Sequence, residues 1–222
     1  MSIKHLSFDV WNTLITPNKE YGTERTKAIA LHFGVTEQEA KDAYKQCKKF
    51  LDNCAELVGF GMSLENNWKL LEKTLGKKDT DLNAIISECD ELFKAYQPAF
   101  DDELKEELKA LKAKGFTLSI KSNTNFISGK TLATVLFNSL NVFQFQHYSD
   151  MFGIAKPSMN FYVLSTHELY NNHNTRDVGC TNILHIGDNK ITDGKCIDIG
   201  WNFEYVKGPE ELLQKLKNNE IV

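Results

Sequence analysis

The sequence predicts an α/β protein whose core is a doubly wound parallel sheet with an inserted four-helix cap. From residue 98 onwards, short apolar segments alternate with segments of helical periodicity, a rhythm typical of a parallel sheet covered by helices on both faces. Residues 17–97 show helical patterns alone, and they separate the first apolar segment from the next by about 85 residues. The helices are therefore expected to form a unit inserted directly after the first strand.

The first strand and its turn are expected within residues 3–14. Apolar residues between Ile3 and Val10 supply the strand, Asp9 lies at its end, and Asn12 and Thr13 favour a turn. The carboxyl end of a strand in an open α/β sheet is a common place for chemistry. An isolated Asp there is more often an ordinary turn residue, so a functional role for Asp9 requires partners elsewhere in the chain.

Four helices are expected in the inserted segment. The pattern of residue 36 to 57 opens with a capping box formed by Thr36 and Glu39. The predicted helices cover residues 18–33, 36–57, 63–75 and 79–96. We therefore divide the chain into an α/β core, residues 1–16 plus 98–222, and a helical cap, residues 17–97. A cap inserted there would lie over the carboxyl ends of the strands and act as a lid.

The remaining residues predict the rest of the sheet and its helices. Strands are expected at residues 116–121, 143–145, 182–186 and 202–206. Helices are expected at residues 102–114, 129–138 and 159–170, after Asp188, and from Pro209 onwards, with a polar loop at 171–175.

Composition disfavours several classes of function. The net charge is −4, and Arg25 and Arg176 are the only arginines, so nucleic-acid binding is disfavoured. No apolar run is long enough to span a bilayer, and no signal peptide is evident, so no membrane partner is expected. The five scattered cysteines include no C-x-x-C pair, which favours free thiols in the cytoplasm. The oligomeric state is not encoded in any pattern we recognise.

Several polar residues are expected to meet Asp9 at one edge of the sheet. Ser122 ends the second strand, Lys156 precedes a helix, Asp188 ends a later strand and Asp193 follows it closely. Three carboxylates in one place repel one another unless cations are present. Lys156 offsets one charge, and Mg²⁺, which prefers oxygen ligands, would offset the rest. Ser122, Lys156 and backbone N–H groups at helix starts suit a phosphate.

These residues carry a resemblance to a known family. The segment DVWNT at 9–13, Ser122-Asn123, Lys156-Pro157 and the G-D-x-x-x-x-D segment at 187–193 occur in this order. The set resembles the haloacid dehalogenase (HAD) superfamily, in its branch with a helical C1-type cap. Each motif alone is weak, whereas four in order are specific. The resemblance implies a Rossmann-like core and hydrolase activity.

The resemblance also implies a role for each matching residue. Asp9 would be the nucleophile that forms an aspartyl-phosphate with a small-molecule phosphate monoester, and Lys156 would offset the charge on the transferred group. Phosphate would be bound by Thr13, Ser122 and Asn123. The cofactor would be Mg²⁺, held by Asp9, the backbone carbonyl of Trp11, Asp188 and Asp193, the last as a ligand or an anchor.

One position departs from the phosphatase pattern and leaves three interpretations open. Trp11 stands where the family's phosphatases carry a second Asp, which protonates the leaving alcohol and then activates water. An indole can do neither, and the loss of such a group typically costs about 10²- to 10⁴-fold in rate. The first interpretation is a Mg²⁺-dependent phosphatase with a slow acid/base step. The second is a 2-haloacid dehalogenase-like hydrolase. The third is a degenerate member that binds phosphate or a partner without turnover.

The retained acidic residues favour the phosphatase interpretation. Dehalogenases of the family carry an aromatic residue at the position of Trp11 and a tyrosine that Tyr162 resembles, but they lack the motif that holds Asp188. Arg25 is too close to Asp9 in sequence to be equated with their cap arginine. In the cap, Tyr21 and Arg25 are candidate substrate contacts, whereas Trp68 is expected to be buried.

Overall fold

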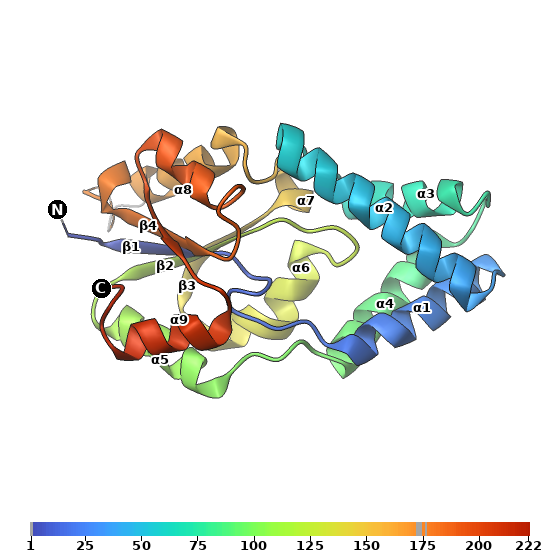
Figure 1. Cartoon of the computed structure of the whole chain (residues 1–222), viewed down its shortest axis with the longest axis horizontal. Coiled ribbons are helices and arrows are strands. Elements are labelled where there is room, and N and C mark those ends of the chain that lie inside the picture. Colours follow the sequence, from blue (N-terminus) through green and yellow to red (C-terminus); the bar gives the residue numbers. More distant parts are fainter. Residues whose placement is uncertain (1, 172–174, 176) are drawn as a thin grey trace.

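A computed structural model of the chain describes residues 2–171, 175 and 177–222. These residues form a five-stranded, all-parallel sheet with the strand order β3-β2-β1-β4-β5 (Figure 1). The strands are β1 (His5–Phe8), β2 (Thr117–Ser122), β3 (Phe143–Tyr148), β4 (Ile183–Gly187) and β5 (Asn202–Tyr205). The predicted α/β class is confirmed, and β1, which carries the N-terminal motif, is the central strand.

The helices follow the predicted order, with local differences. The α-helices are α1 (Lys19–Phe33), α2 (Glu37–Val58), α3 (Leu64–Thr74), α4 (Leu82–Ala95), α5 (Asp102–Ala113), α6 (Gly129–Leu132), α7 (Ser149–Phe152), α8 (Met159–Asn171) and α9 (Pro209–Lys217). Three short 3₁₀ helices, η2 (Asn138–Leu140), η3 (Cys180–Asn182) and η4 (Gly194–Ile199), and one π-helical turn, η1 (Ala133–Phe137), complete the set in the described part of the chain.

Two expected helices differ from the prediction. The single helix expected at 129–138 is divided into α6, η1 and η2, and the chain then turns through Asn141 with a φ of 50°. The helix expected after Asp188 is the 3₁₀ helix η4, because a turn fills the residues before it and Gly200, with a φ of 84°, ends it. The strand expected at 143–145 extends to Tyr148. The loop expected at 171–175 falls mostly outside the described residues.

The two faces of the sheet differ in polarity. One face carries Leu6 and Phe8 of β1 and Ile120 of β2, which pack against α5, α6 and α9 in the largest hydrophobic cluster. The opposite face, covered by α8, carries buried polar side chains, among them Ser7 and His185. Because successive strand residues point to opposite faces, this division follows directly from the alternating sequence of β1, Leu6-Ser7-Phe8.

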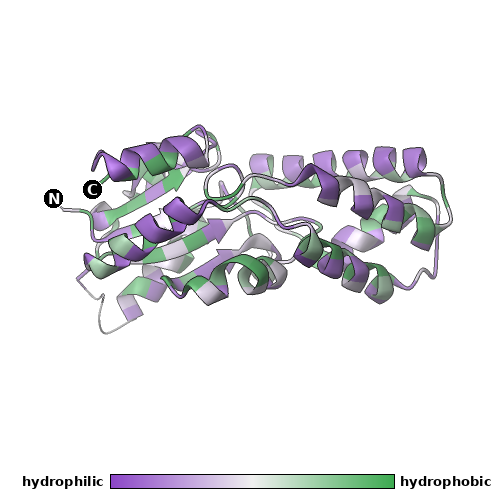
Figure 2. Cartoon of the chain, turned by 90° about the horizontal axis from the view of Figure 1, so that it is seen from below, coloured by the Kyte–Doolittle hydropathy of each residue, from purple (hydrophilic) through white to green (hydrophobic). Residues whose placement is uncertain are grey.

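The four predicted cap helices, α1 to α4, lie together beside the sheet and share a hydrophobic core of their own (Figure 1). Trp68 is fully buried in that core, as expected. The capping box predicted at Thr36 and Glu39 is present. Phe126, from the loop after β2, also enters this core, where its ring lies 5.2 Å from that of Trp68. Hydrophilic residues cover much of the outer surface of α2 (Figure 2).

Two pairs of backbone contacts connect the helical unit to the rest of the chain. Thr16 and Ala99 exchange two hydrogen bonds of 2.9 Å where the chain leaves the sheet and returns to it. After α2, the carbonyl of Gly59 accepts from the N–H of Ala155 at 2.9 Å, and the N–H of Gly61 donates to the carbonyl of Gly153 at 3.2 Å. The loop before Lys156 is thus bound to the helical unit. No described helix is both long and apolar enough for a membrane span.

Candidate active site

Asp9 lies at the carboxyl end of the central strand, where its backbone N–H donates to the carbonyl of Ile186 in β4 at 2.9 Å. The chain then turns sharply, with Asn12 at a φ of 56°. Within this turn Thr13 is fully buried, and its hydroxyl donates to Asp9 Oδ2 at 3.2 Å. The turn therefore fixes the carboxylate of Asp9 in a site that leaves it 6% exposed.

Lys156 links Asp9 of the first motif to Asp193 of the last. Its ammonium donates to Asp9 Oδ1 at 2.5 Å and to Asp193 Oδ1 at 2.6 Å. The backbone of Lys156 is held in turn by Asn123, whose amide accepts from the Lys156 N–H at 2.8 Å and donates to the Lys156 carbonyl at 2.9 Å. All three members of the ion-pair cluster are buried, so their interactions are weakly screened by water.

Asp193 is held by more partners than its neighbour Asp188. Besides Lys156, Asp193 Oδ1 accepts from His185 Nε2 at 3.1 Å, and Asp193 Oδ2 accepts from the N–H of Asn189 at 3.1 Å. Asp188 is only half-buried and lines the cavity described below. Carboxylate oxygens of Asp9, Asp188 and Asp193 lie within 4.8 Å of one another. The three acids predicted to converge are therefore brought together.

The electrostatic environment gives the three carboxyl groups different pKa values. Burial, opposed by Lys156 and assisted by the charges of Asp193 and Asp188, raises the pKa of Asp9 to about 7. Burial also acts to raise the pKa of Asp193, but Lys156 and His185 overcome it and lower that pKa to about 2. Burial and the charge of Asp193 raise the pKa of Asp188. A further cation beside Asp9 and Asp188 would favour the ionised form of both.

His185 is a site residue that the sequence patterns did not single out. It is fully buried in β4, and burial lowers its pKa. With Nε2 donating to Asp193, its Nδ1 accepts from the hydroxyl of Ser7 on β1, at 3.0 Å. The sequence signal for this arrangement was a polar residue between apolar neighbours in each of two strands, Ser7 in β1 and His185 in β4.

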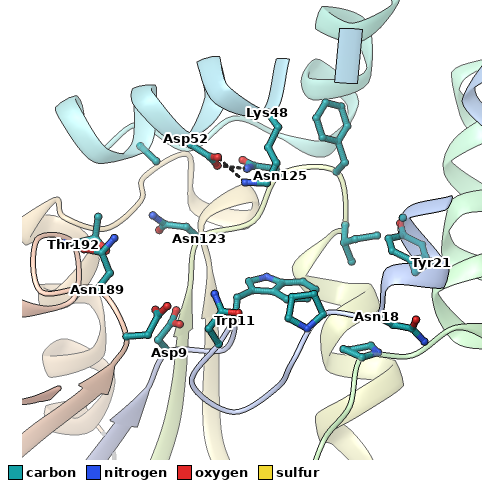
Figure 3. Close-up of a pocket in the computed structure, with 18 of the residues that line it drawn as sticks. Asp9, Trp11, Asn18, Tyr21, Lys48, Asp52, Asn123, Asn125, Asn189 and Thr192 are labelled. Carbon is teal, nitrogen blue, oxygen red and sulfur yellow. Dashed lines mark hydrogen bonds and ion pairs between the residues drawn. The ribbon is translucent and has the colours of Figure 1, made fainter. Parts of the chain in front are cut away.

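A cavity of about 510 Å³ opens in front of these carboxylates (Figure 3). From the sheet side it is lined by Asp9, Trp11, Asn123, Lys156, Asp188 and Asp193. From the helical side it is lined by Tyr21 and Arg25 of α1 and Tyr44 of α2, among others. Two predicted phosphate-binding residues, Thr13 and Ser122, are fully buried and do not line it. The hydroxyl of Ser122 donates to the neighbouring Asn123 carbonyl at 3.3 Å.

The donor set fits a hard divalent cation. Asp9 and Asp188 line the cavity, and burial together with the neighbouring carboxylates raises the pKa of both groups by more than Lys156 lowers it. In the adjoining turn, the N–H groups of residues 12–15 donate to the carbonyls of Val10 and Ile15, so the carbonyl of Trp11 is not used by the turn. Carboxylate and carbonyl oxygens are the ligands that Mg²⁺ prefers. The oxygens of Asp193 are already engaged by protein donors, which suits an anchoring position.

The close approach of Asp193 to Gly187 predicts a specific sensitivity to substitution. A Cβ atom at Gly187 would lie 2.4 Å from Asp193 Cγ, and that side chain is fixed by its ion pair. We expect Gly187→Ala to lower the free energy of unfolding by about 1–3 kcal/mol, measured by urea denaturation. Gly194→Ala is the matched control, because its Cβ would meet Phe203 at an ordinary 3.4 Å. Equal losses in the two variants would contradict the prediction.

The raised pKa of Asp9 predicts how stability depends on pH without metal. The folded chain retains a proton on Asp9 up to about pH 7, whereas the unfolded chain releases it near the ordinary pKa of 3.8. Asp9 therefore makes the folded state less stable as pH rises from about 4 to 7. In EDTA, Asp9→Asn should be more stable than the native protein at pH 8, with a smaller difference at pH 5, by urea denaturation. A difference that grows towards acidic pH would refute this.

Comparison with known proteins supports the same fold. No family profile and no curated protein sequence matches the chain. Among solved structures, similar ones include a HAD phosphatase from Thermococcus onnurineus (TM-score 0.63, 13% identity, covering 99% of this chain and 98% of that one). A 2-haloacid dehalogenase from Pseudomonas syringae gives a TM-score of 0.64 at 17% identity, covering 98% and 99%. A HAD-hydrolase from Bacillus subtilis bound to magnesium gives 0.63 at 18% identity, covering 98% and 100%. The chain therefore has the fold of the haloacid dehalogenase superfamily of hydrolases.

Proposed function

We propose that this protein is a magnesium-dependent phosphatase that hydrolyses a small phosphate monoester through an aspartyl-phosphate on Asp9. The observation that carries the proposal is the cluster of Asp9, Asp188 and Asp193 around Lys156 at the wall of a cavity. With its three carboxylates ionised, this cluster has a net charge of about −2, so a divalent cation would neutralise it. The free thiols expected from the sequence make the cytoplasm the proposed location.

Asp9, the Trp11 carbonyl and Asp188 would hold Mg²⁺, with Asp193 behind them. Bound there, the ion supplies positive charge for the phosphoryl oxygens. Asp9 attacks phosphorus, so that a bond forms between its carboxylate oxygen and phosphorus while the bond from phosphorus to the ester oxygen breaks. The ester oxygen takes a proton from solvent and leaves as the alcohol. Water then attacks the phosphorus of the aspartyl-phosphate and loses a proton to solvent, the bond from phosphorus to Asp9 breaks, and inorganic phosphate and the free carboxylate are released.

The residues around Asp9 have supporting roles in this proposal. Lys156 favours the ionised form of Asp9 and adds a positive charge near the transferred group. Thr13 fixes one oxygen of Asp9 through its hydroxyl, and Asn123 fixes the backbone of Lys156. Because Lys156 lines the cavity and Thr13 and Ser122 do not, direct phosphate contacts are assigned to Lys156 and the backbone around the site.

A 2-haloacid dehalogenase is the second candidate, and Trp11 favours it. An aromatic residue there supplies no proton, and a halide leaves without one. The acidic cluster opposes this candidate, because a haloacid brings its own carboxylate to a site that already holds three. A partner-binding protein without turnover is the third interpretation.

Phosphate release with and without metal distinguishes these functions. We expect the purified protein to release phosphate from small monoesters in Mg²⁺, with loss of that activity in EDTA. Asp9→Asn should reduce the rate by at least about 10³-fold, because it removes the nucleophile, and circular dichroism checks that the fold is kept. Chloride release from 2-chloropropionate in EDTA would identify a dehalogenase and contradict the proposal. Absence of both activities would support the binding protein.

The identity of residue 11 should set the rate of the proposed phosphatase. Trp11→Asp restores a group that can protonate the leaving alcohol and activate water, so kcat should rise by about 10²-fold or more. Trp11→Leu is the matched control, because it removes the indole and its contact with Phe93 without adding an acid. A similar rise in both variants would show that the bulk of Trp11, and not the missing acid, limits turnover.

A further inference from the structure

Arg25 lines the cavity from the helical side without an ion-pair partner. Its guanidinium carbon lies 3.7 Å from the centre of the Tyr44 ring and 5.2 Å from that of Tyr21. Among the described residues, no carboxylate lies within 4.0 Å of its guanidinium nitrogens, and its buried Nε has no hydrogen-bond partner. Arginine in such a place is usually paired, so this one is left with unused hydrogen-bonding capacity.

Tyr21 presents a second unused donor at the same place. Its side chain is more than nine-tenths buried and lines the cavity, and its hydroxyl has no partner in hydrogen-bonding geometry in the described part of the chain, although the nearby Arg25 guanidinium partly offsets the rise that burial causes in its pKa. Burying an unpaired hydroxyl or guanidinium N–H is unfavourable. An occupant of the cavity that supplies acceptor oxygens would satisfy both Tyr21 and Arg25.

The other cation from the helical side that lines the cavity is already neutralised. Lys48 donates to Asp52 at 2.5 Å, and Asp52 also accepts from the amide of Asn125 at 2.8 Å (Figure 3). The face of the Arg25 guanidinium is covered by Tyr44, which leaves its N–H edges for a planar or tetrahedral anion. Glu56 also lines this wall, so the wall as a whole is not positively charged, but Arg25 is its cation without a carboxylate within 4.0 Å and is therefore the place for an anion.

Arg25 and Asp9 belong to different ends of the cavity. In Figure 3, Tyr21 lies across from Asp9, with Trp11 between them. The cavity of about 510 Å³ is large enough for a small molecule that reaches both ends. We infer that Arg25 and Tyr21 bind a second anionic group, a carboxylate or phosphate, at the far end of the substrate. This rests on the proposed function, and it restricts the substrate to phosphate monoesters with an anionic distal group.

The test compares matched probes that differ only in the distal group. ω-Carboxyalkyl phosphates and ω-hydroxyalkyl phosphates of two to five carbons are assayed for kcat/KM with the native protein and Mg²⁺. We expect the carboxylates to be preferred by at least about tenfold at one chain length, since one hydrogen bond to a charged group accounts for that ratio. ω-Phosphoalkyl phosphates show whether the site prefers phosphate to carboxylate.

Variants separate binding by Arg25 from a structural role. Arg25→Gln should abolish the preference, Arg25→Lys should keep part of it, and Lys48→Gln, the control cation, should leave it unchanged. A merely structural arginine would lower kcat/KM equally for both probes in Arg25→Gln, and that result would overturn the inference. Loss of the preference in Lys48→Gln instead would also overturn it.

Calorimetry on the full-length Asp9→Asn protein keeps this test independent of turnover. There the carboxylate probe should bind at least about tenfold more tightly than the hydroxyl probe, and Arg25→Gln in the same background should remove the difference. If the native protein releases no phosphate and this binding preference remains, the phosphatase proposal fails and the anion site stands. Equal binding of both probes overturns the anion site, whatever the activity.

Discussion

The buried contacts of Lys156 with Asp9 and Asp193 are the interaction on which the site depends. They join the end of β1, the loop before α8 and the loop after β4, which are far apart in sequence. Removing Lys156 would leave two buried carboxylates without a positive partner, and such a loss typically costs about 3–5 kcal/mol. The loop that carries Lys156 is also hydrogen-bonded to the segment after α2 through Gly59 and Gly61. The position of this ammonium is therefore coupled to the helical unit.

One face of the sheet carries polar side chains, in place of apolar ones, that support this cluster. The face under α8 carries Ser7 and His185, although apolar residues there would contribute more hydrophobic stabilisation. In exchange, Ser7 orients His185 and His185 orients Asp193. A fully satisfied buried network of this kind rigidifies its members. The opposite face, with Phe8 and Ile120, contributes no side chain to this network and is apolar around the centre of the sheet.

The sequence was informative where a local pattern determines the geometry. Asp9, Lys156 and Asp193 could be placed together because parallel strands end at one edge of the sheet, whatever their exact side-chain contacts. The roles of His185 and Asn123 depend on which strands are neighbours and on contacts between distant segments, and no local pattern encodes these. Thr13 was assigned to phosphate by resemblance, whereas its hydroxyl donates to Asp9. The division of the helix expected at 129–138 likewise depends on tertiary packing and not on periodicity.

Trp11 lies between the two ends of the cavity, and its position gives a physical reason for the departure from the phosphatase pattern. Its indole lies between Asp9 and the wall formed by Tyr21, and it packs edge-on against Phe93 of α4 at 6.5 Å. An Asp at this position would add a fourth carboxylate to a cluster in which Asp9 already has a raised pKa. The indole carries no charge and so avoids that repulsion. It provides an apolar surface between the charged cluster around Asp9 and the hydrogen-bond donors of Tyr21 and Arg25. The same residue therefore removes a proton donor from the reaction and shapes the space that the substrate occupies.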